Sequence, residues 1–384
     1  MKQNHYDYII VGGGVSGLHL SYSFINDEYF KNHKILVIDN LKSQKQNNSF
    51  SFWEKGVGKW DSILENQWNK GEFHSKFGSI HMDFSDYKYK TLNSYDFSNF
   101  VKKKLKKNNQ VKLINDVVLK IRKENKKLII IGNKKNYYAN HVFDSRPNKK
   151  FKKQYNNYTS LKQHFIGWVV RTKEAKFNKD SFVFMDYRIR DKNHTAFTYV
   201  LPFKENEALI EHTYFSKNEC KKKVYENYIR DYMNNHFTSD YKVIKSESGV
   251  IPMTSYPFYR DSTENITKIG SAGGWIKPST GYSFKNSEKN SLKILENIKK
   301  GKSLIIESKT KYKFLDNILL GVLSQYNHMG EMIFYKMIKK NKTKSVLRFL
   351  DEESSFLEDI NIILSVKSKE FIKVFFQSFY KKAL

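Results

Sequence analysis

The chain has 384 residues, of which 39% are apolar and 28% are charged, and this composition is typical of a folded protein rather than a disordered one. Its formal net charge is +29, and because it has only 8 arginines, lysine makes up 60 of its 68 basic residues. Proteins that recognise nucleic-acid bases favour arginine, so we expect no nucleic-acid partner. The charge then indicates either a solvated lysine surface or attraction to an anionic membrane.

Cysteine content and apolar runs restrict the cellular setting. Cys220 is the single cysteine, which excludes an internal disulfide and a cysteine-based metal site and indicates a reducing compartment. The N-terminus runs directly into a strand pattern without a signal peptide, and no apolar run reaches the ~18 residues of a membrane-spanning helix. We therefore expect a cytoplasmic protein without a metal, peripheral on the inner face of the cell membrane.

The first elements in chain order predict a βαβ unit. A buried strand is expected at 7–11 (DYIIV), followed by a glycine cluster, a helix over 18–24 and a second buried strand over 34–38 (KILVI). This order is typical of an α/β domain with a parallel sheet. The chain is long enough for two domains of ordinary size. Downstream, we expect an amphipathic helix over 96–107 and strands over 111–118, 127–131 and 137–143.

From residue 163 onward the pattern changes to consecutive strands separated by polar turns. Such a run predicts a largely antiparallel sheet and hence a second domain. The expected elements are strands over 165–171, 182–189, 197–203, 208–215 and 248–253, with a helix over 217–235.

The chain is then expected to return to the first domain. Residues 268–271 have the character of a buried strand, and a glycine-rich turn and a helix over 281–299 follow them. The first domain would therefore be discontinuous. The last stretch, 311–384, is helical in pattern, with apolar and lysine residues on mixed faces. Such helices either pack on the protein with a solvated lysine face or lie on a bilayer.

A glycine-rich motif follows the first strand and fits GxGxxG. Gly12 permits a tight turn, Gly14 allows the backbone to approach a pyrophosphate, and Gly17 lets helix and strand pack closely. The helix N-terminus would then present amide donors and positive potential to phosphates. Because strand and helix flank the motif, it predicts a dinucleotide site. Its residues are Gly12, Gly13, Gly14, Val15, Ser16 and Gly17.

Two further segments define the expected cofactor contacts. Asp39 follows the second strand, 22 residues after Gly17, and is expected to bind the adenosine ribose; the alternative is a turn residue. Residues 269–284 form a second strand, glycine turn and helix start late in the chain, which favours a large flavin such as FAD over NAD. Within this segment we expect Gly270, Gly281 and Tyr282 to contact the cofactor.

Seven segments along the chain carry a recognisable pattern. They are GGGVSGLHLSYSF at the start, FDSRP (143–147), QHFIGWVV (163–170), FMDYR (184–188), IEHTYFS (210–216), GVIPM (249–253) and GSAGGWIKPSTGYSF (270–284). They occur in the order seen in bacterial lycopene beta-cyclases, which the chain resembles over roughly residues 5–285, with weaker similarity in the tail. FDSRP, QHFxGW and KPSTGY are specific in combination.

The resemblance implies a Rossmann-like FAD-binding fold of the aromatic hydroxylase and glutathione reductase type. It also implies a reduced FAD, NAD(P)H as its reductant, and cyclisation of the linear ends of lycopene to beta-rings without net redox change. Ser271 departs from the Gly-Asp of general flavoproteins, so no ribityl contact is assigned to its side chain. We expect an FAD-binding domain formed by 1–50, 85–155 and 262–300, an inserted antiparallel-sheet substrate domain formed by 51–84 and 156–261, and a helical region over 301–384.

Glu211 is the candidate acid/base, because it matches the acidic position of the family's Glu-containing motif. Strand alternation gives it the same face as Leu209, so we expect it to be buried, and burial keeps a carboxyl protonated; the alternative is a solvent-facing residue. Asp144 and Arg146 form a second candidate group, either a structural pair beside the cofactor or proton-handling catalytic residues. Asp186 with Arg188 is a weaker candidate, and His212 should point to the opposite face.

Aromatic side chains make up 15% of the chain and attract a carbocation without trapping it. Most are expected in the core and a few in the pocket. Two other functions stay open: an FAD-dependent monooxygenase or isoprenoid reductase, and a non-catalytic basic protein that docks on a membrane or RNA. The candidate aromatics are Phe165, Trp168, Phe184, Tyr187, Phe197, Tyr199 and Tyr214.

Overall fold

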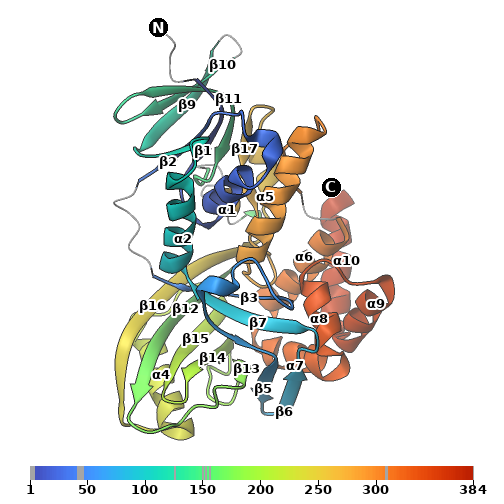
Figure 1. Cartoon of the computed structure of the whole chain (residues 1–384). Helices are drawn as coiled ribbons and strands as arrows, with labels where there is room; N and C mark the ends of the chain where they lie inside the picture. Colours follow the sequence, from blue (N-terminus) through green and yellow to red (C-terminus); the bar gives the residue numbers. More distant parts are fainter. Residues whose placement is uncertain are drawn as a thin grey trace.

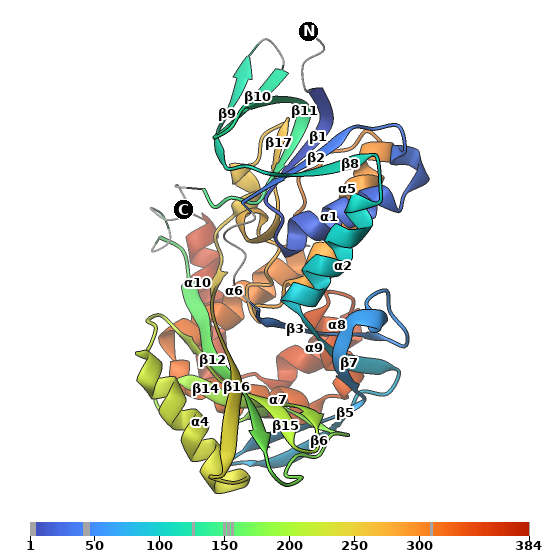
Figure 2. The same cartoon turned by 60° about the vertical axis from the view of Figure 1, so that its left-hand side comes forward.

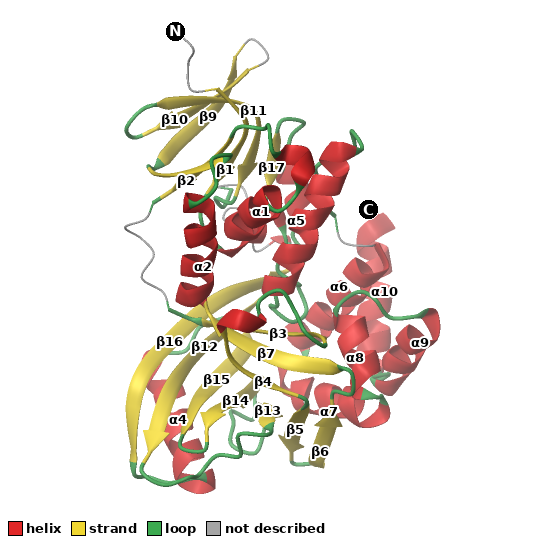
Figure 3. Cartoon of the chain, in the orientation of Figure 1, coloured by secondary structure: helices red, strands yellow, loops and turns green. Residues whose placement is uncertain are grey.

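The computed structural model describes residues 5–40, 47–124, 127–148, 151, 154, 157–307 and 310–383. Figure 1 shows one sheet at the N-terminal end of the molecule, a second sheet at the opposite end and a group of C-terminal helices beside the second sheet. A small third sheet lies between the two large ones, as the colouring by secondary structure in Figure 3 makes clear.

The first large sheet has the strand order β8-β2-β1-β11-β10-β9, with β17 paired to β11. Its central strand β2 is buried along its whole length, as expected for a parallel strand covered on both faces. Strands β1, β2, β8, β11 and β17 are parallel, and β9 and β10 add an antiparallel edge. The strands are β1 (His5–Val11), β2 (Ile35–Asp39), β8 (Val111–Asn115), β9 (Val118–Glu124), β10 (Lys127–Gly132), β11 (Asn136–Asp144) and β17 (Ile266–Lys268).

Three helices lie between this sheet and the rest of the molecule, as Figure 2 shows. They are α1 (Val15–Ile25), α2 (Ser94–Lys106) and α5 (Phe284–Lys299), and they bury Phe24, Phe97 and Ile294 in one common core. Because α5 comes from a distant part of the sequence and packs against α1, this half of the molecule is discontinuous in the chain, as predicted.

The second large sheet has the order β16-β12-β15-β14-β13-β5-β6 and is antiparallel except for the β13–β5 pair. Helix α4 (Lys222–His236) covers one of its faces. The predicted antiparallel run is confirmed. The strands are β5 (Lys70–Ser75), β6 (Gly78–Asp83), β12 (Ser160–Thr172), β13 (Phe182–Asp186), β14 (Thr195–Lys204), β15 (Glu207–Ser216) and β16 (Tyr241–Thr254).

The third sheet, β3-β7-β4, was not predicted from the sequence. It consists of β3 (Ser49–Lys55), β4 (Leu64–Trp68) and β7 (Tyr87–Asn93). The predicted domain boundaries at residues 50/51 and 84/85 remain a proposal. They assign most of β3 and all of β7 to different domains, although the two strands pair with each other.

Several predicted boundaries were wrong for local reasons. The strand expected over 111–118 is two strands, because the chain turns at Asp116, whose carboxylate accepts the amides of Val117 and Lys134. The strand expected over 268–271 ends at Lys268, and a 3-10 helix (Gly270–Gly273) follows, with Gly270 at φ 62°. The other short 3-10 helices are Glu28–Phe30, Asp61–Ile63, Phe258–Asp261 and Asn327–Met329.

The C-terminal helices pack against the second sheet in one hydrophobic core, where Phe334 and Met337 meet Phe197 and Phe215. Within the described part of the chain, no helix has both the length and the apolar character needed to cross a membrane. The helices are α6 (Thr310–Gln325), α7 (Gly330–Lys340), α8 (Thr343–Leu350), α9 (Phe356–Ser365) and α10 (Lys369–Ala383).

A buried lysine ties these helices to the turn before α5. The ammonium of Lys277 is 3.1 Å from Asp316 and 3.3 Å from Glu352, and its side chain is 4% exposed. We predict that Lys277→Ala lowers the free energy of unfolding by about 3–5 kcal/mol, because it leaves buried carboxylates without their cation. Urea denaturation measures the loss.

Lys289→Ala is the matched control, because Lys289 pairs with Glu353 at a largely exposed site where an ion pair stabilises by at most about 1 kcal/mol. Equal losses in the two variants would contradict this account of the Lys277 cluster.

Candidate active site

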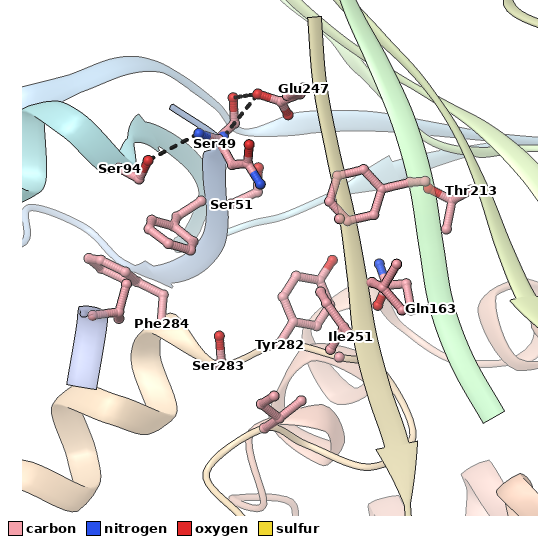
Figure 4. Close-up of a pocket in the computed structure, with 18 of the residues that line it drawn as sticks. Ser49, Ser51, Ser94, Gln163, Thr213, Glu247, Ile251, Tyr282, Ser283 and Phe284 are labelled. Atoms are coloured by element: carbon pink, nitrogen blue, oxygen red, sulfur yellow. Dashed lines mark hydrogen bonds between the residues drawn. The ribbon is translucent and has the colours of Figure 1, made fainter. Parts of the chain in front are cut away.

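A single cavity of about 1290 Å³ lies between the N-terminus of α1 and the face of the second sheet opposite α4. Pockets for one small ligand measure ~300–1000 Å³, so this cavity has room for a cofactor and a substrate together. The glycine motif and residues 270–271 and 279–284 line one end, and β12, β14, β15 and β16 line the other. Figure 4 shows part of its lining.

The glycine motif has the geometry of a phosphate cradle. Strand β1 ends at Val11 and α1 begins at Val15, as predicted. Gly12 has φ 101°, and a Cβ on Gly17 would lie 2.0 Å from the carbonyl oxygen of Gly12. A Cβ on Gly14 would meet nothing within 4 Å. The first turn of α1 lines the cavity, and helix first turns carry amides without intrahelical partners, which suits an anion.

Asp39 and Ser16 hold this cradle in place. The amide of Gly13 donates to Asp39 Oδ1 at 2.9 Å, which fixes the loop against the end of β2. The hydroxyl of Ser16 lies 2.8 Å from that of Ser287 and so joins α1 to α5. A Cβ on Gly270 would come within 2.9 Å of the Ser16 hydroxyl. The predicted ribose contact of Asp39 remains a proposal.

The turn that contains Gly281 borders the cavity next to a side-chain oxygen, Gln163 Oε1, that accepts no hydrogen bond from the described residues. Gly281 has φ 75°, and a Cβ there would lie 2.0 Å from Gln163 Oε1. That oxygen is buried and has no hydrogen-bond partner among the described residues. Gln163 and Tyr282 both border the cavity, as Figure 4 shows. A ligand with hydrogen-bond donors fits this place, because a buried acceptor without a partner is costly.

Glu211 lines the cavity from β15, where it is partly exposed rather than buried as predicted, and a second carboxyl lies two strands away. Gly167 on β12 is opposite Glu211 on one side and opposite Glu247 on the other. A Cβ on Gly167 would lie 3.4 Å from Glu211 Cβ and 3.3 Å from Glu247 Cγ. The two glutamate side chains therefore approach each other over a glycine, on the sheet face that lines the cavity.

Hydrogen bonding differs between the two carboxyls. Glu211 accepts the hydroxyl of Thr213 at 2.7 Å. Glu247 accepts both the amide and the hydroxyl of Ser49 at 3.0 Å, as Figure 4 shows, and lies 3.5 Å from the ammonium of Lys245.

Burial raises the pKa of Glu211 to about 8, the charge of Glu247 adds to this, and the Thr213 hydroxyl opposes it. Burial also raises the pKa of Glu247, against the effect of Lys245 and Ser49. At neutral pH, Glu211 is therefore mainly a neutral carboxylic acid, which can donate a proton.

Aromatic side chains form the wall around Glu211. Tyr199 is opposite Glu211 in the β14–β15 register, and its hydroxyl is hydrogen-bonded to that of Tyr89, which lies 3.3 Å from the hydroxyl of Tyr282. Burial raises the pKa of all three phenols well above the usual value, so they stay neutral. Of the predicted aromatics, the cavity is lined by Phe165, Phe184, Phe197 and Tyr199; Trp168 and Tyr214 pack under α4, and Tyr187 packs in the core.

Asp144 and Arg146 form a structural ion pair away from the cavity lining. Arg146 Nε lies 2.9 Å from Asp144 Oδ1, and the ammonium of Lys268 lies 2.9 Å from Oδ2. Burial acts in the opposite direction, but Arg146 and Lys268 hold the pKa of Asp144 below its usual value. The pair joins β11 to β17 as an ionised group, so the geometry favours the structural alternative over catalysis.

The weaker candidates are also structural. Arg188 pairs with Asp186, whose carboxylate also accepts the Tyr232 hydroxyl at 2.7 Å. His212 lies 3.0 Å from the Thr198 hydroxyl and stacks on Tyr228 of α4. His212 is therefore on the opposite face of β15 from Glu211, as strand alternation predicted.

Sequence reasoning missed Glu247 and Ser49. The strand was predicted over 248–253, one residue beyond Glu247, whereas β16 in fact starts at Tyr241. No strand was predicted where β3 lies. The sequence does contain a signal for Glu247. A glycine on a strand leaves room on one sheet face for large side chains from both neighbouring strands.

Comparison with known proteins gives a family match and one curated relative. The family model described as lycopene cyclase protein matches residues 7–377. Neoxanthin synthase, chloroplastic, from Solanum tuberosum is 24% identical over 327 residues, which are 77% of this chain and 61% of that protein. The chain thus spans less than two thirds of the length of this relative.

Solved structures share the fold at low identity. A geranylgeranyl bacteriochlorophyll reductase-like protein from Thermoplasma acidophilum has a TM-score of 0.61 at 13% identity, with 97% of this chain and 98% of that chain covered. A flavoprotein/dehydrogenase from Cytophaga hutchinsonii has a TM-score of 0.56 at 9% identity, with 93% and 98% covered. These similarities concern the fold alone, and they confirm the predicted flavoprotein type of α/β fold.

Proposed function

The chain belongs to the lycopene cyclase family, and we propose that it is a lycopene beta-cyclase, which converts the linear ends of lycopene to beta-ionone rings, first in gamma-carotene and then in beta-carotene. The observation that carries this proposal is the carboxyl of Glu211, whose pKa is raised by desolvation and which lines an aromatic-walled cavity shared with the dinucleotide cradle. Such a cavity suits an apolar chain with a reactive end.

Cyclisation requires an acid but no oxidant. A proton adds to the terminal alkene, the resulting tertiary carbocation closes onto a neighbouring double bond, and a ring carbon loses a proton. The substrate and product are isomers, so electrons and atoms balance. Glu211 donates the proton, and its raised pKa keeps it in the donating form near neutral pH.

The aromatic wall suits the positive intermediate. Phe184, Phe197 and Tyr199 border the cavity. An aromatic face attracts a cation by about 0.5–2 kcal/mol and forms no covalent bond with it. These residues therefore support a carbocation while the ring closes.

We further propose that the dinucleotide is FAD, reduced by NAD(P)H. The motif from Gly12 to Gly17 and the first turn of α1 would hold the pyrophosphate, Asp39 the ribose, and Gly270, Gly281 and Tyr282 would border the remainder. The acceptor of Gln163 supports a ligand with donors in this place. Reduced flavin held by these residues would supply negative charge to the active site without being consumed.

The direct test is expression in a bacterial host that accumulates lycopene, followed by pigment chromatography. We expect bicyclic beta-carotene from the wild-type chain, and unchanged lycopene from Glu211→Gln with the flavin still bound, because the amide has no acidic proton. Glu207→Gln is the matched control, since Glu207 lies on the same strand but pairs with the exposed Arg171.

Unchanged lycopene with folded, flavin-bound wild-type protein would overturn the proposal, and full activity of Glu211→Gln would reassign the acid. Consumption of NAD(P)H in proportion to product would instead favour a monooxygenase or a reductase.

We also propose that the protein acts at the inner face of the cytoplasmic membrane, where a carotenoid dissolves. The apolar residues of α9 support this, because they form one exposed stripe at helix spacing while Ile362 on the opposite face is buried. Phe356 is 73% and Leu357 is 71% exposed. The net charge of +29 favours anionic lipid.

We predict that replacing Phe356 and Leu357 together by serine weakens binding to anionic phospholipid vesicles at least about tenfold, because each side chain contributes about 1.5–3 kcal/mol when buried. Vesicle co-sedimentation measures the change. Val57→Ser is the control, since Val57 is 87% exposed but lies after β3 and not on α9. An equal loss for Val57→Ser, or none for the α9 variant, would remove α9 as the contact.

A further inference from the structure

We propose that Glu211 and Glu247 form a coupled pair of carboxyl groups that holds a single proton on Glu211 at neutral pH, with ionised Glu247 as the positioning residue. This inference rests on the proposed function, in which Glu211 is the acid. It goes further by assigning a role to Glu247, which acts through Glu211 and need not touch the substrate.

The strand register brings the two groups together. Glu211 and Glu247 lie on strands β15 and β16, each opposite Gly167 of the central strand β12. Any other residue at 167 would place a side chain between them, because a Cβ there already lies within 3.4 Å of atoms of both glutamates. The two side chains meet over the same glycine, and neighbouring carboxyls that are partly desolvated resist double ionisation.

The hydrogen-bond donors decide which carboxyl keeps the proton. Glu247 receives the amide and hydroxyl of Ser49 and lies near the Lys245 ammonium, and all three favour its ionised form. Glu211 has the Thr213 hydroxyl as its one donor among the described residues. The carboxyl with more donors ionises first, so Glu247 carries the charge and Glu211 the proton.

The start of β3 holds Glu247 rigidly. Asn48 donates its side-chain amide to the carbonyl of Ser248 at 3.0 Å, and its own backbone amide donates to the Ser94 hydroxyl at 3.0 Å. Ser49 is therefore fixed on both sides.

The other titratable groups around the pair leave this assignment intact. Tyr89, Tyr199 and Tyr282 face it from β7, β14 and the turn before α5, and burial keeps these phenols neutral. Lys245 of β16 is the cation beside Glu247. Glu65 of β4 is a further carboxyl in the neighbourhood; burial raises its pKa, and the charge of Glu247 contributes to this.

Infrared titration of the purified full-length protein tests the pair without substrate. The carbonyl band of a protonated carboxyl, identified by its loss in Glu211→Gln, should disappear in wild type with a midpoint near pH 8. Glu247→Gln should lower this midpoint by at least about one pH unit, because it removes the neighbouring charge. Glu247→Asp should restore most of the wild-type value.

Two further variants make the result independent of folding defects at residue 247. Lys245→Met should raise the midpoint, because it removes the cation beside Glu247, and Glu207→Gln at the start of β15, where Glu207 pairs with Arg171, should leave it unchanged. An unchanged midpoint in both Glu247→Gln and Lys245→Met would overturn the proposal.

The two hypotheses fail separately. If no cyclised pigment forms but the midpoints shift as stated, the proposed function is wrong and the carboxyl pair stands. If beta-carotene forms but the midpoints do not move, Glu211 remains the acid and Glu247 is only structural. In the active enzyme, the pH above which cyclisation activity falls should be lower for Glu247→Gln than for the wild type.

Discussion

Glu211 keeps its proton because desolvation on the face of β15 that lines the cavity penalises its charged form, and because the second carboxyl beside it is better supplied with donors. Much of the surrounding architecture serves this arrangement. The antiparallel sheet supplies the register that sets two glutamates over Gly167, and the aromatic residues exclude solvent without offering charge. Such an environment keeps a carboxyl protonated near neutral pH, so that a proton is available for the alkene.

The first sheet contributes the other end of the same cavity. Its βαβ opening ends in a glycine turn whose backbone can approach a phosphate closely, and α5 returns from late in the chain to close the cradle. The C-terminal helices complete the enclosure, because Phe334, Met337 and Leu350 reach the cavity lining. The buried Lys277 cluster links these helices to the turn that carries Gly281.

Much of this arrangement could be predicted from the sequence. The strand, turn and helix around Gly12–Gly17, the antiparallel run and the return of the chain to the first sheet were predicted and are confirmed, and so is the family resemblance. The position of Glu211 on the cavity-lining face followed from its alternation with Leu209, although its side chain is partly exposed there rather than buried. These features depend on local spacing, which the sequence records directly.

The features that escaped prediction depend on contacts between distant segments. The strands β3, β4 and β7 are short and carry many polar residues, so they become recognisable only through their pairing with one another. The proposed role of Glu247 depends on its contacts with Gly167, 80 residues earlier in the chain, and with Ser49, 198 residues earlier. Asp144 and Arg146 resembled catalytic groups in the sequence because ion pairs and acid/base residues share the same side chains.

The most direct test of the account is cyclisation of unlabelled lycopene by the purified protein in deuterium oxide, with mass spectrometry of the product. If an exchangeable carboxyl proton starts the reaction, the beta-carotene formed carries one deuterium atom for each ring and no other change in mass. A product without deuterium, or one that has gained further hydrogen or oxygen, would contradict the claim that acid/base chemistry alone forms the rings.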